Sequence, residues 1–321
     1  MKRILIIQTA FLGDVILATP IASELKRIFP DSKIDFLVKK GNESLLSNNP
    51  NLYNIYVFDK KDGKIKNIFA LIRTFRKSKY DLVVNLHRFG SSGLITALSG
   101  AKLKYGFKKN PFSFAFSKSF DHELSNGVHE VSRNLSLIKE FGAKDLVRPE
   151  LFPGTEAFET VKKYDGTYFC MAPASIWYTK QMPKEKWVEL IQRKASKGTV
   201  YLIGGPDDFD LCEEIGSKSG VDHCENLCGK LSLMESAALM NGAQMNYVND
   251  SSPMHMASAM NAPVTAFFCS TVPEFGFTPL SENAVVKQVT SELECRPCGL
   301  HGYQSCPKGH FKCGEIDLED L

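Results

Sequence analysis

The chain has 321 residues, of which 43% are hydrophobic, so it is long and apolar enough for two domain cores of ordinary size. Its formal net charge is only +3, which gives no reason to expect nucleic acid as a partner. No apolar run approaches the roughly 20 residues that span a bilayer, and the run Ile4–Ile7 is too short for a signal peptide. We therefore expect a cytoplasmic globular protein.

Short apolar runs alternate with amphipathic stretches, which is typical of α/β domains built on parallel sheets. In the first half, strands are predicted at Ile4–Gln8, Lys33–Val38, Asn54–Phe58 and Leu82–Leu86. Helices of this half are predicted at Ile21–Ile28, near Ile65–Lys77 and at Val131–Phe141. Thr19 and Pro20 fit the N-cap and the first residue of the first helix.

The second half repeats the rhythm of strand, polar loop and helix. Its strands are predicted at Tyr168–Ala172, Val200–Ile203, Met245–Val248 and Val264–Phe268. Its helices are predicted at Lys184–Lys194, Phe209–Ser217 and Leu233–Met240, the last with a capping box of Ser232 and Glu235. Between the halves, Val147–Asp165 is rich in Pro and Gly and is typical of a linker, so we predict domains at 1–155 and 156–321.

The loop after the first strand contains Gly13 and Asp14. Glycine permits a tight turn or a close backbone approach. Asp14 stands where the strand meets the following helix, and its carboxylate has two candidate roles. It either caps the helix, whose dipole would lower its pKa, or acts as a general base at the sheet edge where ligands bind in open α/β folds.

The loop after Tyr168–Ala172 contains Ser175, Thr179 and Lys180. Lysine is a point charge suited to a diphosphate, and the two hydroxyls are hydrogen-bond donors, although an exposed lysine in a loop is common. After the next strand comes Gly204–Gly205, which an ordinary turn explains equally well. The chain has no P-loop and no G-x-G-x-x-G motif, which argues against an NTPase or a Rossmann dinucleotide enzyme.

Asp250, Ser251 and Ser252 lie between a short apolar run and a helical pattern that ends before Pro263. A helix N-terminus offers unbonded N–H groups and the positive end of a dipole, and the serines add hydroxyls, so this segment is suited to a phosphate. An ordinary N-cap explains the same residues.

Taken in order, these loops resemble those of glycosyltransferase family 9, the ADP-heptose:lipopolysaccharide heptosyltransferases. The resemblance spans nearly the whole chain. It is carried by five groups of residues: Phe11–Asp14 with Thr19–Pro20, Pro173–Ser175 with Thr179–Lys180 and Pro183, Gly204–Pro206, Cys228–Leu233, and Asn249–His255.

The resemblance implies an α/β protein of GT-B fold, in which two Rossmann-like domains face a central cleft. The acceptor would be held by 1–155 and the nucleotide sugar by 156–321. It implies an inverting transfer that requires no cofactor, with Asp14 as the base and Lys180 steadying the leaving diphosphate. The expected donor site consists of Ser175, Thr179, Gly204, Gly205, Asp250, Ser251, Ser252 and His255.

The resemblance also implies substrates, namely an ADP-heptose-like donor and a lipopolysaccharide-core acceptor. Gly13, His87 and Arg88 are the candidate acceptor-binding residues; plain surface positions are the alternative for His87 and Arg88. Ala174 and Ser252 stand where the family often has glycine, which leaves the donor preference open. Lysine-rich stretches add the expectation of a peripheral contact with the cytoplasmic face of the inner membrane; an ordinary solvated face and a face for an anionic ligand are the alternatives.

Four cysteines cluster in the pattern Cys295-x2-Cys298-x7-Cys306-x6-Cys313. The spacing is suited to a structural zinc site. Reduced thiols packing a loop are the alternative, and a disulfide is disfavoured in a reducing compartment.

Three other functions fit the sequence. The first is a GT-B transferase that uses another nucleotide sugar for a different surface glycan, because nothing separates ADP from UDP or GDP. The second is a non-catalytic nucleotide- or glycan-binding protein, which would not need Asp14. The third is an interaction protein organised by zinc.

Overall fold

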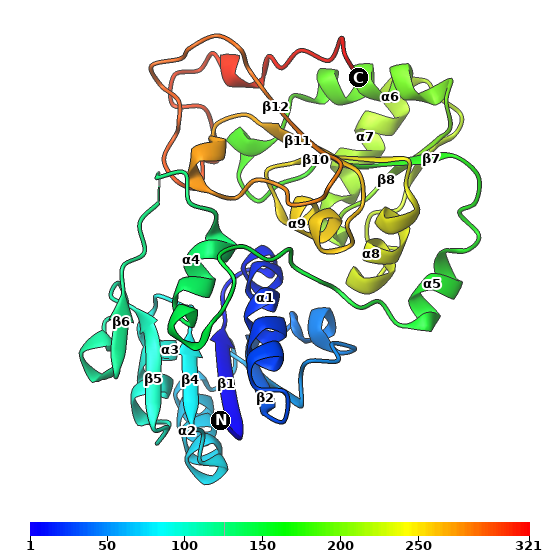
Figure 1. Ribbon diagram of the computed structural model, residues 1–321. Helices are drawn as coiled ribbons and strands as arrows, with labels where there is room; N and C mark the ends of the chain where they lie inside the picture. The colour runs from blue at the N-terminus through cyan, green and yellow to red at the C-terminus, as the bar shows by residue number, and fades with distance from the viewer. Residues whose placement is uncertain (125) are drawn as a thin grey trace. The chain divides into compact units, whose positions relative to one another are not determined.

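The computed structural model describes residues 1–124 and 126–321, which form two compact units (Figure 1). Unit 1 comprises Met1–Leu124 and Val128–Phe152. Unit 2 comprises Pro153–Leu321 together with residues 126–127. In the described part of the chain, no helix has the length and apolar character needed to cross a membrane.

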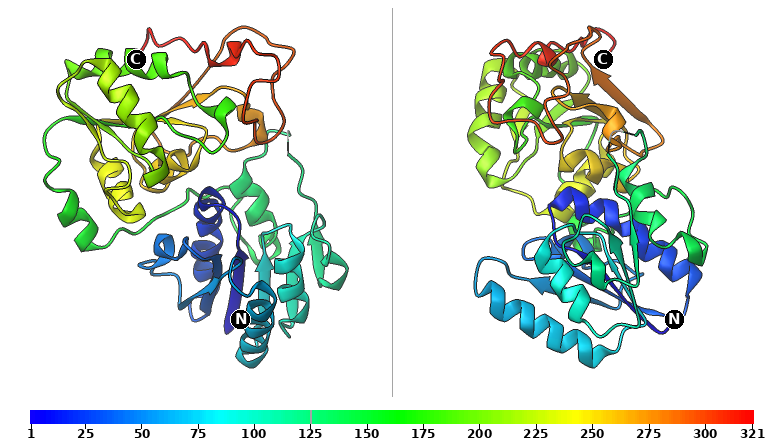
Figure 2. Two further views of the ribbon diagram at one scale, coloured as in Figure 1. Left: turned by 180° about the vertical axis from the view of Figure 1, so that it is seen from behind. Right: turned by 90° about the vertical axis from the view of Figure 1, so that its left-hand side faces the viewer.

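Unit 1 is a parallel sheet with helices on both faces. Its elements are β1 (Arg3–Gln8), α1 (Leu12–Ile28), β2 (Lys33–Lys39), β3 (Asn54–Phe58), α2 (Lys64–Ser78), β4 (Leu82–Asn85), α3 (Gly90–Leu98), β5 (Leu103–Phe107), β6 (Lys118–Phe120) and α4 (Glu130–Ser136). The strand order is β3-β2-β1-β4-β5-β6. Helices α1 and α4 pack together on one face, and α2 and α3 pack together on the other (Figure 2).

The central strand β1 explains why both faces need helices. Its residues Ile4 to Ile7 are all fully buried, and successive side chains of a strand point to opposite faces. Leu5 and Ile7 pack in one cluster with Phe75 of α2. Ile4 and Ile6 therefore point to the opposite face, which α1 covers.

Helix α1 begins at Leu12, so the prediction that Thr19 and Pro20 start this helix is wrong. Pro20 lies inside the helix, where its missing N–H leaves the carbonyl of Ile16 without a helical partner. The Thr19 hydroxyl donates to that carbonyl at 2.8 Å. The helix thus accommodates proline because the preceding side chain replaces the lost hydrogen bond.

Unit 2 repeats this architecture. Its elements are α5 (Thr155–Val161), β7 (Tyr168–Ala172), α6 (Lys184–Ala195), β8 (Thr199–Leu202), α7 (Phe209–Ser219), β9 (Cys224–Asn226), α8 (Leu233–Gly242), β10 (Met245–Asn249), α9 (Ser252–Ala259), β11 (Val264–Phe268) and β12 (Ala284–Gln288). The strand order is β12-β11-β10-β7-β8-β9. In both units, the first strand therefore lies between the second and the fourth.

Every predicted strand is present, and the predicted helices are present with shifted ends. The capping box of α8 is confirmed, because Ser232 and Glu235 exchange hydrogen bonds of 2.6 and 3.3 Å. Strands β5, β6, β9 and β12 and helices α3 and α5 were not predicted. Two of these strands, β6 and β9, are only three residues long, too short to show an alternating pattern.

Candidate active site

The strand order brings most of the predicted site residues to one point in each unit, whereas Gly204 and Gly205 follow the adjacent strand β8. In unit 2 the neighbours β7 and β10 lead into the loops of Lys180 and Asp250. In unit 1 the neighbours β1 and β4 lead into Asp14 and His87. On the two sides of each strand pair, the chain continues toward opposite edges of the sheet. Open parallel sheets bind ligands at this position.

Lys180, at the end of a short 3₁₀ turn (Tyr178–Lys180), forms an ion pair with Asp250. The Lys180 Nζ lies 2.6 Å from Asp250 Oδ2, and the two side chains are only 15% and 8% exposed. The Thr271 hydroxyl, which follows β11, donates to the same carboxylate oxygen at 2.6 Å. Because an ammonium group has three protons, Lys180 keeps the capacity to donate to a ligand while Asp250 holds it.

Asn249 is a positioning residue that the sequence analysis did not single out for the site. Its side-chain oxygen accepts the N–H of Met182 at 3.0 Å, and its side-chain nitrogen donates to the carbonyl of Pro173 at 2.6 Å. These two bonds tie both ends of the Lys180 loop to the end of β10. The sequence feature that could have identified Asn249 is an amide side chain at the last position of a buried strand, next to Asp250.

Helix α9 begins two residues after Asp250. Ser251 is its N-cap residue and Ser252 its first residue, yet no side chain caps the helix. The Ser251 hydroxyl instead donates to the carbonyl of Asn249 at 3.3 Å. The ordinary N-cap interpretation therefore does not hold for Ser251, and this helix end remains suited to an anion. His255 is buried one turn further on.

The other predicted donor residues shape the loops around this pair. The buried Thr179 hydroxyl accepts the N–H of Tyr303 at 2.8 Å, and the Ser175 carbonyl accepts from Gln181 at 2.7 Å. A Cβ on Gly204 would lie 2.8 Å from the carboxylate of Asp208, and the N–H of Gly205 already donates to that carboxylate. Their contact with a donor stays a prediction.

Asp14 fulfils the capping role, because its carboxylate accepts the N–H of Phe11 at 3.0 Å in the first turn of α1. The expected lowering of its pKa is wrong. Burial and the nearby Glu130 raise the pKa of Asp14 to about 6, and the opposing effects of the Phe11 N–H and Arg88 are smaller. Capping does not exclude general-base chemistry, since a carboxyl with this pKa is mostly ionised at neutral pH. Gly13 is buried beside it in the same turn.

His87 is buried, and its Nδ1 lies 3.0 Å from the Thr9 hydroxyl. Burial, Lys60 and Arg88 lower the pKa of His87 to about 3, so the ring is neutral at physiological pH. It would meet an acceptor through hydrogen bonds and not through charge. Arg88 is exposed and supplies the positive charge at this position.

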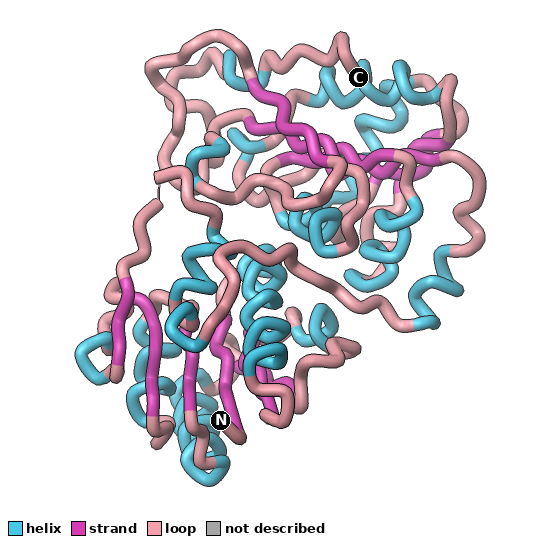
Figure 3. The backbone as a smooth tube through the Cα atoms, in the orientation of Figure 1, coloured by secondary structure: helices cyan, strands magenta, loops and turns pink. Residues whose placement is uncertain are grey.

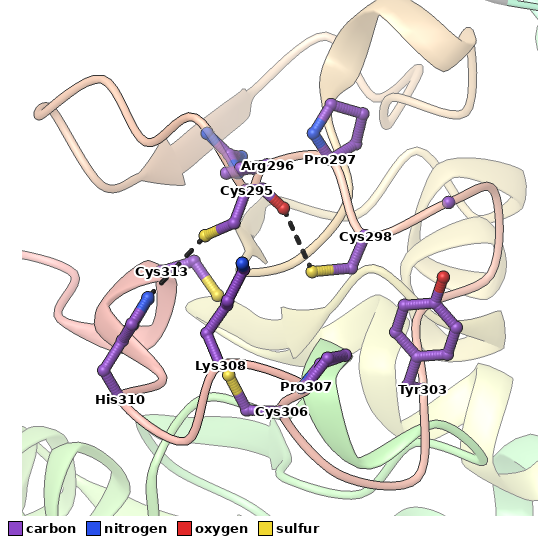
Figure 4. Close-up of a pocket in the computed structure, with 11 residues that line it drawn as sticks. Cys295, Arg296, Pro297, Cys298, Tyr303, Cys306, Pro307, Lys308, His310 and Cys313 are labelled. Atoms are coloured by element: carbon purple, nitrogen blue, oxygen red, sulfur yellow. Dashed lines mark hydrogen bonds between the residues drawn. The ribbon is translucent and has the colours of Figure 1, made fainter.

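The four cysteines of the C-terminal segment line one cavity of about 210 Å³ (Figure 4). All four are unpaired thiols. Among the described residues, no three or more His, Cys, Asp or Glu side chains are placed so that they could hold a metal ion in this conformation. Zinc binding therefore stays a prediction.

Two parallel α/β units of the same topology, each with polar residues at its switch point, define a glycosyltransferase of the GT-B fold. The family model "Glycosyltransferase family 9 (heptosyltransferase)" matches residues 68–304, and the chain belongs to this family. It is 31% identical over 291 residues to lipopolysaccharide heptosyltransferase 3 of Escherichia coli, an alignment that covers 86% of this chain and 85% of the relative.

Solved structures show the same fold. The E. coli ADP-heptose lps heptosyltransferase II superposes with a TM-score of 0.80 at 22% identity, covering 97% of both chains. The E. coli heptosyltransferase WaaC with ADP superposes with a TM-score of 0.75 at 21% identity, covering 88% of this chain and 92% of the other. The predicted family, fold class and enzyme class are therefore confirmed.

Proposed function

We propose that this glycosyltransferase moves a heptose, with inversion, from an ADP-heptose-like donor to a sugar of the lipopolysaccharide core, at the cytoplasmic face of the inner membrane. The names of its relatives support these substrates. The single observation that carries the proposal is the Lys180–Asp250 ion pair, held by Thr271 beside the uncapped start of α9.

The donor half of the reaction needs positive charge where the nucleoside diphosphate leaves. Lys180 provides an ammonium group, and α9 provides N–H groups and the positive end of its dipole. These groups stabilise the developing charge of the diphosphate without help from a metal ion, so we propose that the chemical step requires no cofactor. Ser175, Thr179, Gly204, Gly205, Ser252 and His255 complete the proposed donor site.

The acceptor half needs a base. Asp14, with its pKa near 6, takes the proton of the acceptor hydroxyl. The hydroxyl oxygen then forms a bond to the anomeric carbon while the bond from that carbon to the diphosphate oxygen breaks, and the electron pair leaves with the nucleoside diphosphate. Gly13, the neutral His87 and the charged Arg88 are the proposed acceptor contacts.

A transferase for another nucleotide sugar is the second candidate. Ala174 and Ser252 each add a side chain near the proposed phosphate path, where the family often has glycine. Either side chain is able to change the shape of the donor site.

A panel assay tests the proposal. The purified protein is incubated with ADP-, UDP- and GDP-sugars, each with and without lipopolysaccharide-core acceptors, while nucleotide release and acceptor mass are followed. We expect release only when ADP-heptose and an acceptor are both present, with the acceptor heavier by one heptose. Turnover with a UDP- or GDP-sugar would support the second candidate, and nucleotide binding without turnover would support a non-catalytic binding protein.

A further inference from the structure

The last part of the chain is a long segment without regular secondary structure. Between β12 and the C-terminal residue, residues 289–321 contain no strand and no α-helix, and all of them are described (Figure 3). Structureless segments longer than about 12–15 residues are uncommon in compact domains unless they have a functional role or a specific restraint. The four-cysteine cavity lies within this segment.

Two of the four cysteines, Cys298 and Cys306, each stand just before a turn that contains a glycine with a positive φ. Cys298 is followed by Gly299 at a φ of +67°, and Cys306 is followed after two residues by Gly309 at a φ of +72°. The backbone N–H groups of Phe311, Lys308, Gly309 and His310 are directed at the Cys306 side chain. Backbone N–H groups directed at a sulfur stabilise a thiolate, which is the form that binds metals.

The charge around the cavity also suits a metal thiolate site. Four thiolates around a divalent ion carry a net charge of −2, and Lys308 and Arg296 line the same cavity (Figure 4). In the structure, the Cys298 thiol donates to the carbonyl of Cys295 at 3.3 Å, and Cys295 Sγ lies 3.8 Å from His310 Nε2. Side-chain rotation within the cavity is therefore needed before the four sulfurs converge.

The cysteine segment packs on the loop that carries Lys180. The N–H of Thr179 donates to the carbonyl of Tyr303 at 3.0 Å, and the N–H of Tyr303 donates back to the Thr179 hydroxyl at 2.8 Å. The approach is close enough that a Cβ on Gly302 would lie 2.7 Å from that hydroxyl. Tyr303 lies between Cys298 and Cys306 in the chain. Its position against Thr179 therefore depends on the conformation of the turns that carry these two cysteines.

The same segment also supports Thr271, which holds Asp250. The N–H of Cys298 donates to the carbonyl of Ser270 at 2.8 Å. The Arg296 guanidinium donates to the carbonyls of Cys269 and Thr271, both at 2.7 Å. Residues of the cysteine segment thus contact both the loop that carries Lys180 and the loop that carries Thr271.

We propose that Cys295, Cys298, Cys306 and Cys313 together bind one soft divalent metal ion, such as Zn²⁺, and that this ion holds residues 295–313 against the loops that place Lys180 and Thr271. The ion is structural and takes no part in sugar transfer. Metal binding does not depend on the proposed function, whereas the effect on the donor site does.

The first test measures metal content without reference to activity. The full chain, purified without chelators or a metal-affinity tag, is analysed by elemental mass spectrometry before and after reconstitution with Zn²⁺. We expect about one ion per chain, and we expect Co²⁺ substitution to give the intense absorption of cobalt–thiolate bonds. Cys306→Ser and Cys298→Ser should lose the ion. The matched control Cys224→Ser, at a partly exposed thiol on β9, should keep it.

The second test measures the coupling to the donor site. Reversible chelation of the wild-type protein avoids variants that fail to fold, and circular dichroism verifies that the domain stays folded. On metal removal, we expect faster amide hydrogen exchange at residues 176–181 and unchanged exchange in α2. We also expect the Kd for ADP to rise about tenfold, the loss of roughly one good hydrogen bond.

Failure to bind an ion after reconstitution overturns the proposal, as does a mass showing that the four thiols are joined as disulfides. Unchanged exchange at residues 176–181 on metal removal overturns the coupling alone. None of these three results bears on the proposed transfer reaction, which is read from sugar transfer in the panel assay.

Discussion

Lys180 and Asp250 meet at a single carboxylate oxygen, with the ammonium nitrogen 2.6 Å away and the Thr271 hydroxyl on the same atom. The three residues follow β7, β10 and β11, so three loops have to be in place before the ammonium group is positioned. Asp250 therefore acts as a positioning residue. It orients Lys180 and also offsets part of its charge until an anionic ligand arrives.

Lys180→Ala should lower kcat/KM by on the order of 100-fold or more, because the developing charge on the diphosphate loses a preorganised cation. Steady-state kinetics with the preferred nucleotide sugar measures this. The control is Lys184→Ala, which removes a partly exposed lysine paired with Glu214 on the surface. Lys180→Ala with activity within twofold of wild type would contradict the assignment.

Thr271→Val should raise the KM for the donor roughly tenfold, since the hydroxyl that holds Asp250 is lost while the side-chain volume is kept. Thr271→Ser restores the donor and should recover most of the affinity. Kinetics and thermal unfolding are measured together, so that a loss of stability is distinguished from a loss of binding. Equal kinetic parameters for the valine and serine variants would show that the hydroxyl has no positioning role.

Asp14→Asn should lower kcat by roughly 10²- to 10⁴-fold, the usual contribution of a general base. Because the base acts in its ionised form, the rate of the wild-type enzyme should rise with pH through about 6, the pKa of Asp14. A pH–rate profile of wild type gives the midpoint. Transfer that is unaffected by the substitution rules out Asp14 as the base.

The raised pKa of Asp14 also predicts how stability depends on pH. A carboxyl with a higher pKa in the folded state stabilises the fold when protonated, and this contribution is lost as pH rises through about 6. Asp14→Asn cannot ionise, so between pH 4 and 7 it should gain stability relative to wild type, by at most about 3 kcal/mol. The two proteins are compared by denaturant unfolding across this range.

Asp81→Asn is the control with the opposite sign. The Lys102 ammonium and the N–H of Lys2 lower the pKa of Asp81 to about 2. A carboxyl of this kind stabilises the fold above its unfolded pKa, so its substitution should cost stability at neutral pH and little at pH 2. The same sign for both variants would contradict the electrostatic explanation.

Thr19→Val should lower the free energy of unfolding by about 1–3 kcal/mol, because it leaves the buried carbonyl of Ile16 without a donor. Pro20→Ala restores an N–H for that carbonyl. The cost of Thr19→Val should therefore be smaller in the Pro20→Ala background, although the N–H of Glu150 still loses its acceptor on Thr19. A double-mutant cycle by denaturant unfolding measures the difference, and strict additivity would refute the replacement of one hydrogen bond by the other.

Much of the fold was predictable because its signals are local. Buried strands such as Ile4–Gln8 and Val264–Phe268 are short apolar runs between polar loops, and the helix capped by Ser232 shows its start in four residues. The loops that carry Asp14, Lys180 and Asp250 were recognised from their residues and from their place after strands. The start of α1 was mispredicted because Thr-Pro is a common helix start, and only the fold shows a hydroxyl replacing the missing N–H.

The sequence by itself determined where most of the strands lie and which loops are polar enough to bind a ligand, because both properties follow from composition and periodicity. It did not determine the limits of the two units, since residues 126–127 and 153–155 were assigned to the first domain and belong to unit 2. Only the tertiary structure decided that β7 lies between β8 and β10, and therefore that Lys180, Asp250 and Thr271 share one oxygen. It also decided that Asp14 has a raised pKa, since burial and Glu130 act through space. Strand pairing, burial and charge–charge contacts join residues far apart in the chain, and no local pattern records them.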